Sequence, residues 1–174
     1  IKIADVPNTA LSALDSLKDL KNIKYITVHA SGGLEMLKAV TKKAKKINKS
    51  IKVLGVTILT SLDNKSVQEI GYKNKVEKLV LKQVSLIKKS GASGVICSAH
   101  EAKIIRKKFK NFFIVTPGIR LPGDKENDQK RITTPKQAFQ NKASAIVIGR
   151  SITTGSPKKN IKKLIDHLNR WSKV

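Results

Sequence analysis

Short apolar runs rich in β-branched residues alternate with helix-like patterns along the whole chain. The runs are continuous in apolar residues, which is typical of strands that are buried on both faces of a parallel sheet. We expect strands at Ile1–Ile3, Tyr25–His29, Val53–Leu59, Gly94–Cys97, Phe112–Thr116 and Ala145–Ile148.

Amphipathic helices are predicted between these strands, because apolar residues recur there at spacings of three and four. The stripes are Leu11, Leu14 and Leu17; Leu37, Val40, Ala44 and Ile47; Val76, Leu79, Val80, Val84 and Ile87; and Ile161, Leu164, Ile165 and Leu168. Shorter helices are expected at Glu101–Phe109 and from Pro135 onward. Asn8 or Thr9 is expected to cap the first helix.

This alternation predicts an α/β fold of right-handed βαβ units, as an open doubly wound sheet or as a barrel. Polar and glycine-rich segments follow the strands, at the ends where such folds bind ligands. A site built from many such loops favours a (β/α)8 TIM barrel. About six strands are visible where a barrel has eight. We therefore expect residues 1–174 to form a single domain, the C-terminal part of a TIM barrel that lacks its first two strands.

The positive charge of the chain suggests a different class of function. It has 174 residues, with 36 Lys+Arg and 12 Asp+Glu, and a formal net charge of +24. Such a balance is compatible with nucleic-acid binding. All but five of the basic residues are lysines, however, and aromatic residues make up 4% of the chain. Arginines, which bind phosphates and base edges through two hydrogen bonds, and aromatic rings, on which bases stack, are therefore scarce. A lysine-rich solvated surface is favoured, and a basic nucleic-acid-binding module remains an alternative.

The single cysteine, Cys97, excludes an intramolecular disulfide framework and favours a reduced, cytoplasmic setting. Because Cys97 lies in an apolar run, we expect it to be buried. His100 and His167 stand apart from other ligands, so we expect no metal. His29 ends a predicted strand and is either structural or a substrate contact. No apolar run approaches the length of a membrane span, and we expect no membrane association.

Two groups of residues suggest chemistry. Lys2 and Asp5 end the first predicted strand, where a lysine near carboxylates stays cationic and can donate a proton to a carbanion. A solvated strand-end lysine is the other interpretation. Thr116–Arg120 and a later Gly149-Arg150 follow the last two strands, where barrels build a phosphate site. Gly149 permits close backbone approach, Arg150 a bidentate contact, and Gln129 a neutral donor.

Taken together, these motifs resemble the bacterial branch of the orotidine 5′-phosphate decarboxylase family. The resemblance covers essentially the whole chain in order and spacing. It rests on Lys2-x-x-Asp5-Val6-Pro7-Asn8-Thr9, Val28–Gly33, Thr57–Ser61, Gly94–Ser98, Thr116–Arg120, Asp128–Arg131 and Ile148–Arg150. It implies a homodimeric (β/α)8 barrel that uses no metal or organic cofactor and converts orotidine 5′-monophosphate to UMP and CO2 in pyrimidine biosynthesis.

The resemblance also implies residue roles. Lys2 is then the proton donor to C6 of the pyrimidine, and Asp5 is the carboxylate lent to the neighbouring subunit's site, which Val6 and Thr9 line. Thr60, with Ser61 beside it, corresponds to the pyrimidine contact region. The ribose-phosphate and phosphate contacts are Arg120, Gln129, Gly149 and Arg150, and Leu121–Lys130 is the loop that closes over the phosphate.

The chain departs from the family pattern at a few points. The first Asp of the signature falls just before Ile1, and a further Asp and Lys belong to the two absent strands, so we expect the 174-residue chain alone to be an inactive fragment. Ala4 replaces a His and Lys130 an Arg. The nearest alternative is a sugar-phosphate decarboxylase or aldolase of the same phosphate-binding barrel group.

Overall fold

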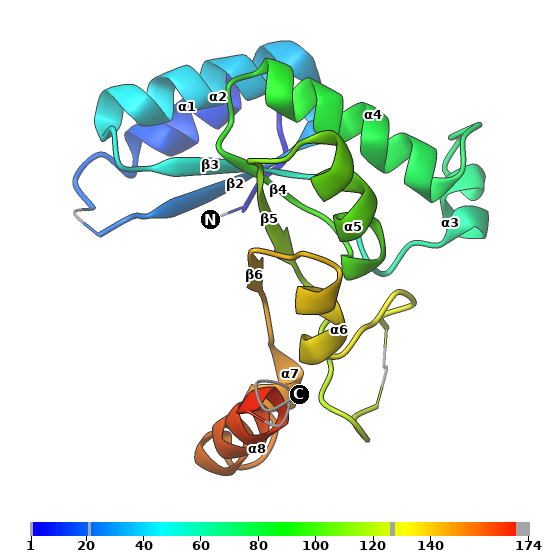
Figure 1. The fold of residues 1–174 in the computed structure, drawn as a ribbon. Coiled ribbons are helices and arrows are strands. Elements are labelled where there is room, and N and C mark those ends of the chain that lie inside the picture. Colours follow the sequence, from blue (N-terminus) through cyan, green and yellow to red (C-terminus); the bar gives the residue numbers. More distant parts are fainter. Residues whose placement is uncertain (1, 21, 126–127, 170–174) are drawn as a thin grey trace. The chain divides into compact units, whose positions relative to one another are not determined.

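The computed structural model describes residues 2–20, 22–125 and 128–169 (Figure 1). The chain divides into two compact units, described in turn. The first unit consists of Ile1–Thr57 and Glu77–Ile96, and the second of Ile58–Val76 and Cys97–Val174. Two sequence predictions reach beyond the described residues, namely the strand start at Ile1 and residues 126 and 127 of the expected loop. The single domain stays a prediction.

A parallel four-stranded sheet forms the centre of the first unit. Its strands β1 (Lys2–Ile3), β2 (Tyr25–His29), β3 (Lys52–Val56) and β4 (Gly94–Ile96) pair in chain order. The predicted strands are confirmed, and β2 has the predicted bounds. β3 ends at Val56 and not at Leu59 as predicted, and the carbonyls of Ile58 and Leu59 accept hydrogen bonds from the Arg131 side chain.

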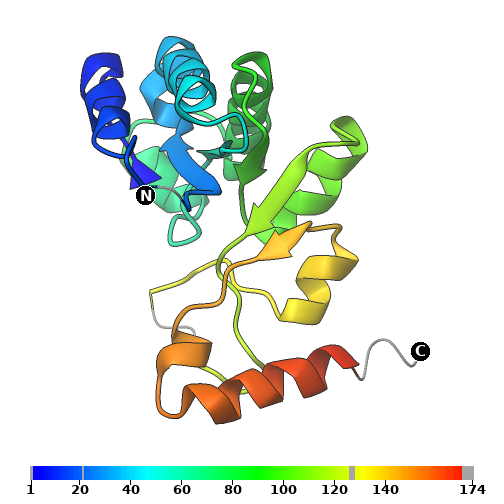
Figure 2. The same cartoon turned by 90° about the vertical axis from the view of Figure 1, so that its left-hand side faces the viewer.

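Helices α1 (Pro7–Asp15), α2 (Gly33–Ile47) and α4 (Val76–Lys89) lie along one face of this sheet (Figures 1 and 2). A short 3-10 turn, η1 (Ala30–Gly32), leads into α2. The buried face of α2 carries Leu37 and Val40, as its apolar stripe predicts. On β3, a Cβ atom at Gly55 would lie 2.3 Å from Cγ1 of the α4 residue Ile87. Only glycine lets α4 pack this closely on β3.

The start of α1 differs from the prediction. Val6 occupies the N-cap position without a side-chain cap, and Pro7 opens the helix, so capping by Asn8 or Thr9 is wrong. Proline suits the first helical position because its missing N–H is not needed there. Instead, the Val6 N–H donates to Oδ1 of Asp5 at 2.8 Å.

The second unit contains the parallel pair β5 (Phe113–Thr116) and β6 (Ala145–Ile146), with Val115 opposite Ala145. Helices α5 (Ala99–Lys108) and α6 (Pro135–Gln140) pack beside these strands around buried Ile119 (Figure 2). The predicted helix start at Pro135 is confirmed, and a capping box fixes it. Thr134 and Gln137 exchange backbone and side-chain hydrogen bonds there.

The remaining helices of the second unit are α3 (Asn64–Glu69), α7 (Arg150–Thr153) and α8 (Pro157–Asn169). The sequence predicts α8 and a helical segment after Gly149-Arg150. It does not predict α3, because Val67 is the only buried residue of that helix and one residue makes no apolar stripe.

The cysteine and the lysines differ in how far they are buried. Cys97 is 1% exposed, which confirms the expected buried position, and burial raises the pKa of its thiol. None of the lysines within the described ranges is buried. Across the same residues, no helix is both long and apolar enough to cross a membrane.

Candidate phosphate pocket and candidate catalytic residues

Lys2 and His29 lie at the ends of neighbouring strands of the first unit. Lys2 is exposed and pairs in register with Thr27, whereas Ile3 is buried on the other face. His29 follows Thr27 by two residues and therefore shares its face of β2. Burial, and then the positive charge of Lys2, lowers the pKa of His29. His29 thus lies on the same face of the sheet as Lys2, and the positive charge of Lys2 acts on the imidazole.

Asp5, Val6 and Thr9 lie in the β1–α1 connection and the first turn of α1. All three are exposed, and the apolar side chain of Val6 is 62% exposed. The backbone carbonyl of Asp5 lies 3.4 Å from where a Cβ of Gly32 would stand, which brings the turn after β2 against this connection. The fold of the first unit therefore presents Asp5, Val6 and Thr9 together at its surface.

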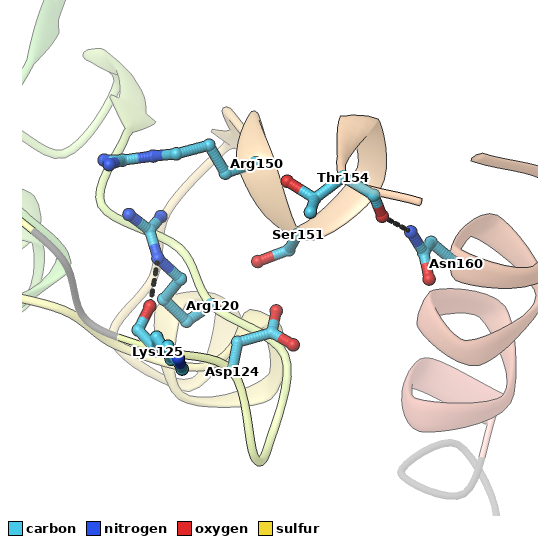
Figure 3. A pocket seen from close by; sticks show the side chains of 7 residues that line it. All are labelled: Arg120, Asp124, Lys125, Arg150, Ser151, Thr154 and Asn160. Carbon is cyan, nitrogen blue, oxygen red and sulfur yellow. Dashed lines mark hydrogen bonds between the residues drawn. The ribbon is translucent and has the colours of Figure 1, made fainter. Parts of the chain in front are cut away.

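The second unit contains a pocket of about 320 Å³ (Figure 3). Arg120, which is 6% exposed, and Arg150 extend toward the same space from two separate segments. The Arg120 guanidinium is oriented by its own neighbourhood. Its Nε donates to the Lys125 carbonyl at 3.2 Å, and an Nη donates to the Ile119 carbonyl at 3.0 Å. The other lining residues are Asp124, Lys125, Ser151, Thr154 and Asn160.

Gly149 and Arg150 form the start of α7 at this pocket. Apart from its two chain neighbours, no atom of the described residues lies within 4 Å of where a Cβ of Gly149 would stand, so the backbone is open on that side. The first N–H groups of a helix have no intrahelical acceptor and favour an anion. Arg150 forms an ion pair with Asp128, and the hydrogen bond from Arg150 lowers the pKa of that carboxyl. The hydroxyl of Ser151 is buried and has no hydrogen-bond partner in the described structure.

Thr60 anchors the segment that carries Gln129. Its carbonyl accepts hydrogen bonds from the N–H groups of Lys130 at 3.3 Å and Arg131 at 3.1 Å. Its hydroxyl donates to Oε1 of Gln129. Two sequence-predicted site residues are therefore in direct contact, although they come from motifs that lie far apart in the chain.

Lys130 ties the same segment to α3. Its Nζ donates to Oδ2 of Asp63 at 2.9 Å. Asp63 is also the N-cap of α3, where its Oδ1 accepts from the Ser66 N–H at 2.8 Å. The Ser66 hydrogen bond and then that of Lys130 hold the pKa of Asp63 well below its usual range.

Gly118 explains the glycine of the Thr116–Arg120 motif. Its φ is +75°, and a Cβ there would lie 3.0 Å from the carbonyl oxygen of Arg131. This close approach lets the Arg120 N–H donate to the Thr133 carbonyl at 3.0 Å, and the Thr133 N–H to Gly118 at 3.1 Å. The backbone that carries Arg120 is thus paired with the segment that follows Gln129.

A buried ion pair lies behind these residues, and the sequence motifs do not reveal it. Arg131 and Glu101 form this pair, with side chains 11% and 7% exposed. Burial raises the pKa of Glu101, and the adjacent guanidinium opposes that rise. Glu101 falls on the buried stripe of α5, four residues before Ile105, and an acidic residue on such a stripe is the signal that could have revealed the pair.

Each unit thus gathers part of the sequence-predicted set. The first presents Lys2, Asp5, Val6 and Thr9, and the second contains Thr60, Arg120, Gln129, Gly149 and Arg150. Within the described residues, no group of three His, Cys, Asp or Glu side chains could hold a metal ion.

Parallel βα units with a pocket of two arginines beside a Gly-Arg helix start define an α/β protein with a candidate anion site. The sequence profile of the Orotidine 5'-phosphate decarboxylase / HUMPS family matches residues 1–164. The chain belongs to this family.

Individual relatives agree. The chain is 39% identical over 169 residues to an orotidine 5'-phosphate decarboxylase of Coxiella burnetii, covering 95% of this chain and 71% of that protein. It is 42% identical over 155 residues to that of Staphylococcus epidermidis, covering 88% and 67%. The crystal structure of the Lactobacillus acidophilus enzyme matches with a TM-score of 0.79 and 34% identity, over 97% of this chain and 73% of that one.

The fold extends to distant proteins. The crystal structure of orotidine 5'-monophosphate decarboxylase from Sulfolobus solfataricus matches with a TM-score of 0.72 at 15% identity, over 98% of this chain and 71% of that one. These matches confirm the predicted fold class, a TIM barrel represented here by six parallel strands.

Proposed function

We propose that this chain carries the decarboxylation of orotidine 5′-monophosphate to UMP and CO2, a step of pyrimidine biosynthesis in the cytoplasm. The observation that supports this proposal best is the pocket that Arg120 and Arg150 line. The chain also matches the family model and the decarboxylase relatives along nearly its whole length. The pocket has the charge and size for a phosphate monoester.

The phosphate is the group that this pocket recognises. Arg120 and Arg150 offer planar guanidinium groups that can bind phosphate oxygens in a bidentate manner. Gly149 leaves its backbone open to an oxyanion, and Gln129 adds an amide. Binding at a group remote from the reacting carbon supplies energy that can be used in the transition state. Thr60, which holds Gln129, contacts the pyrimidine in this proposal.

Lys2 is the proposed catalytic residue. Cleavage of the bond between C6 and the carboxylate releases CO2 and leaves the electron pair on C6. The ammonium group of Lys2 stabilises this carbanion electrostatically and then transfers a proton to C6, which gives UMP. Solvent reprotonates the lysine. This assignment is supported by the exposed position of Lys2 at the end of β1.

A second copy of the chain completes the proposed site. Asp5, with Val6 and Thr9, is lent to the neighbouring subunit of a homodimer. The exposure of all three residues supports this role, because an apolar side chain that is 62% exposed at Val6 is suited to an interface.

The substitution Lys2→Ala tests the proposed function. For the unaltered protein expressed from its own gene, we expect the absorbance of orotidylate to fall as the substrate is converted to UMP. Lys2→Ala should slow kcat by at least about 10³-fold, because proton transfer and carbanion stabilisation are both lost. Lys52→Ala is the matched control, since Lys52 is an exposed lysine on β3 of the same sheet, two register positions before the level of Lys2. It should leave kcat unchanged.

The alternatives give different results in the same assay. An unchanged kcat in Lys2→Ala contradicts the catalytic assignment. Magnesium-dependent turnover of a sugar phosphate, without turnover of orotidylate, would instead indicate the sugar-phosphate decarboxylase or aldolase. Salt-sensitive binding to random duplex DNA without affinity for UMP would indicate the nucleic-acid-binding module.

A further inference from the structure

We infer that Glu101 and Arg131 are positioning residues, whose buried ion pair fixes the segment that carries Gln129 and the backbone of Arg120 for phosphate binding. This inference rests on the proposed function, because it assigns these two residues to the same phosphate site. Neither residue lines the pocket itself.

Arg131 is held from three directions. One Nη donates to a carboxylate oxygen of Glu101, and the other donates to the carbonyls of Ile58 and Leu59, each at 3.1 Å. The guanidinium group therefore joins α5 to the connection between β3 and α3. A lysine at this position could not make these contacts together, because it lacks the planar fork of donors.

Glu101 supplies the fixed end of this connection. It lies in the first turn of α5, next to the N-cap Ser98, which is 0% exposed and whose hydroxyl accepts from the His100 N–H at 3.3 Å. The start of α5 and the Glu101 carboxylate thus lie in the same buried part of the second unit.

The binding residues depend on the backbone that Arg131 anchors. On one side, the N–H groups of Lys130 and Arg131 pair with the carbonyl of Thr60, whose hydroxyl holds Gln129. On the other side, Thr133 pairs with Gly118 and Arg120. Arg131 thus lies where the two backbone pairings meet, and its displacement would misplace both Gln129 and Arg120.

The composition of the pair fits a positioning role better than a purely stabilising one. Oε2 of Glu101 and Nε of Arg131 are buried and have no hydrogen-bond partner among the described residues. Buried ion pairs that are incompletely hydrogen-bonded contribute little net stability compared with apolar side chains. What an apolar pair could not supply is the orientation of the Ile58 and Leu59 carbonyls.

Binding of two ligands that differ only in the phosphate tests this inference. We would measure the dissociation constants of UMP and of uridine for the protein expressed from its own gene, and for Glu101→Gln and Arg131→Lys. Each substitution should weaken UMP binding by at least about tenfold, because small misplacements of binding groups are costly. Uridine lacks the phosphate and keeps only contacts such as that of Thr60, so its affinity should fall by clearly less than that of UMP in both variants.

Glu35→Gln is the matched control. Glu35 also lies in the first turn of a helix and pairs with Lys38 at 3.1 Å, but its side chain is 80% exposed. This control should change neither constant. Partial unfolding of a variant would lower the fraction that binds both ligands equally, so that the ratio of the two constants separates positioning from stability.

Two results would overturn the inference. A UMP-to-uridine ratio unchanged in both variants removes the positioning role while leaving the proposed function intact. If the unaltered protein binds UMP no more tightly than uridine, the phosphate site itself is absent, and the proposed function falls together with this inference.

Discussion

Ser151 stands out among the individual residues because it lines the pocket of Arg120 and Arg150 while its own hydroxyl is buried. It lies in the first turn of α7, directly after Arg150, and its Oγ has no hydrogen-bond partner in the described part of the chain (Figure 3). An unsatisfied buried hydroxyl costs stability. A phosphate oxygen in the pocket would satisfy it, since a hydroxyl can donate to an anion.

Ser151→Ala should therefore have opposite effects on stability and on binding. We expect the free protein to keep its stability or gain up to about 1 kcal/mol, because a buried unsatisfied group is removed. UMP affinity should fall by about tenfold, the size of a lost hydrogen bond to a charged group. Thermal unfolding and titration calorimetry measure the two effects. Ser156→Ala, at an exposed hydroxyl that accepts from the Lys159 N–H at the start of α8, is the control for binding only, and a loss of stability in Ser151→Ala would contradict the prediction.

At the scale of elements, the packing of α4 on β3 depends on one missing side chain. Gly55 is buried in β3, and all three of its nearest contacts would be with carbon atoms of Ile87. The apolar stripe of α4 predicts which face is buried but not how closely that face approaches the sheet.

Gly55→Ala should destabilise the protein by about 1–3 kcal/mol through overpacking. Ile87→Ala should cost about 2–5 kcal/mol through a cavity, and the double variant should cost clearly less than the sum. Chemical denaturation of the four proteins measures this coupling. Gly55→Ala combined with Leu14→Ala, at a fully buried leucine of α1, the helix that packs on α2, should be additive. Additivity in the Gly55–Ile87 cycle would show that the close approach is not a real constraint.

The elements also indicate what the sequence alone could supply. Strands such as β2 could be predicted, because a run of β-branched residues is a local signal. For the same reason, the Gly149-Arg150 motif could be assigned to a helix start, which lies at the pocket of Arg120 and Arg150. The identity of the partner of Glu101 could not be predicted. An acidic residue on the buried stripe of α5 indicates that a partner exists, but Arg131 lies 30 positions away and nothing local marks it as that partner. The predicted cap of α1 was wrong because Pro7 takes the first helical position. Val6 is then the N-cap residue, and Asn8 and Thr9 lie inside the helix.

Charge is the property that belongs to the whole molecule. The net charge is +24, and the lysines of the described ranges all remain accessible to solvent. A surface of this sign raises the local concentration of small anions and speeds their association. The excess of lysine can therefore serve a nucleotide substrate without any role in binding nucleic acids.

The rate of UMP association should accordingly depend on salt. Between about 0.01 M and about 0.15 M salt the screening length falls from about 30 Å to about 8 Å, so that the association rate constant should drop by about tenfold. Stopped-flow measurements would follow this rate. Uridine carries no charge, and its association should change little over the same range. Equal salt dependence for both ligands would show that the surface charge does not steer the substrate.

Asp63 gives the second unit an internal reporter. One carboxylate oxygen caps α3 while the other holds Lys130, next to Gln129. A ligand that displaces the Gln129 segment also displaces Lys130, which is hydrogen-bonded to the same carboxylate. The hydrogen bond from the Ser66 N–H to Asp63, in the first turn of α3, then changes in strength. The amide proton of Ser66 is therefore a spectroscopic gauge of pocket occupancy, readable by hydrogen exchange at a helix that itself touches no ligand.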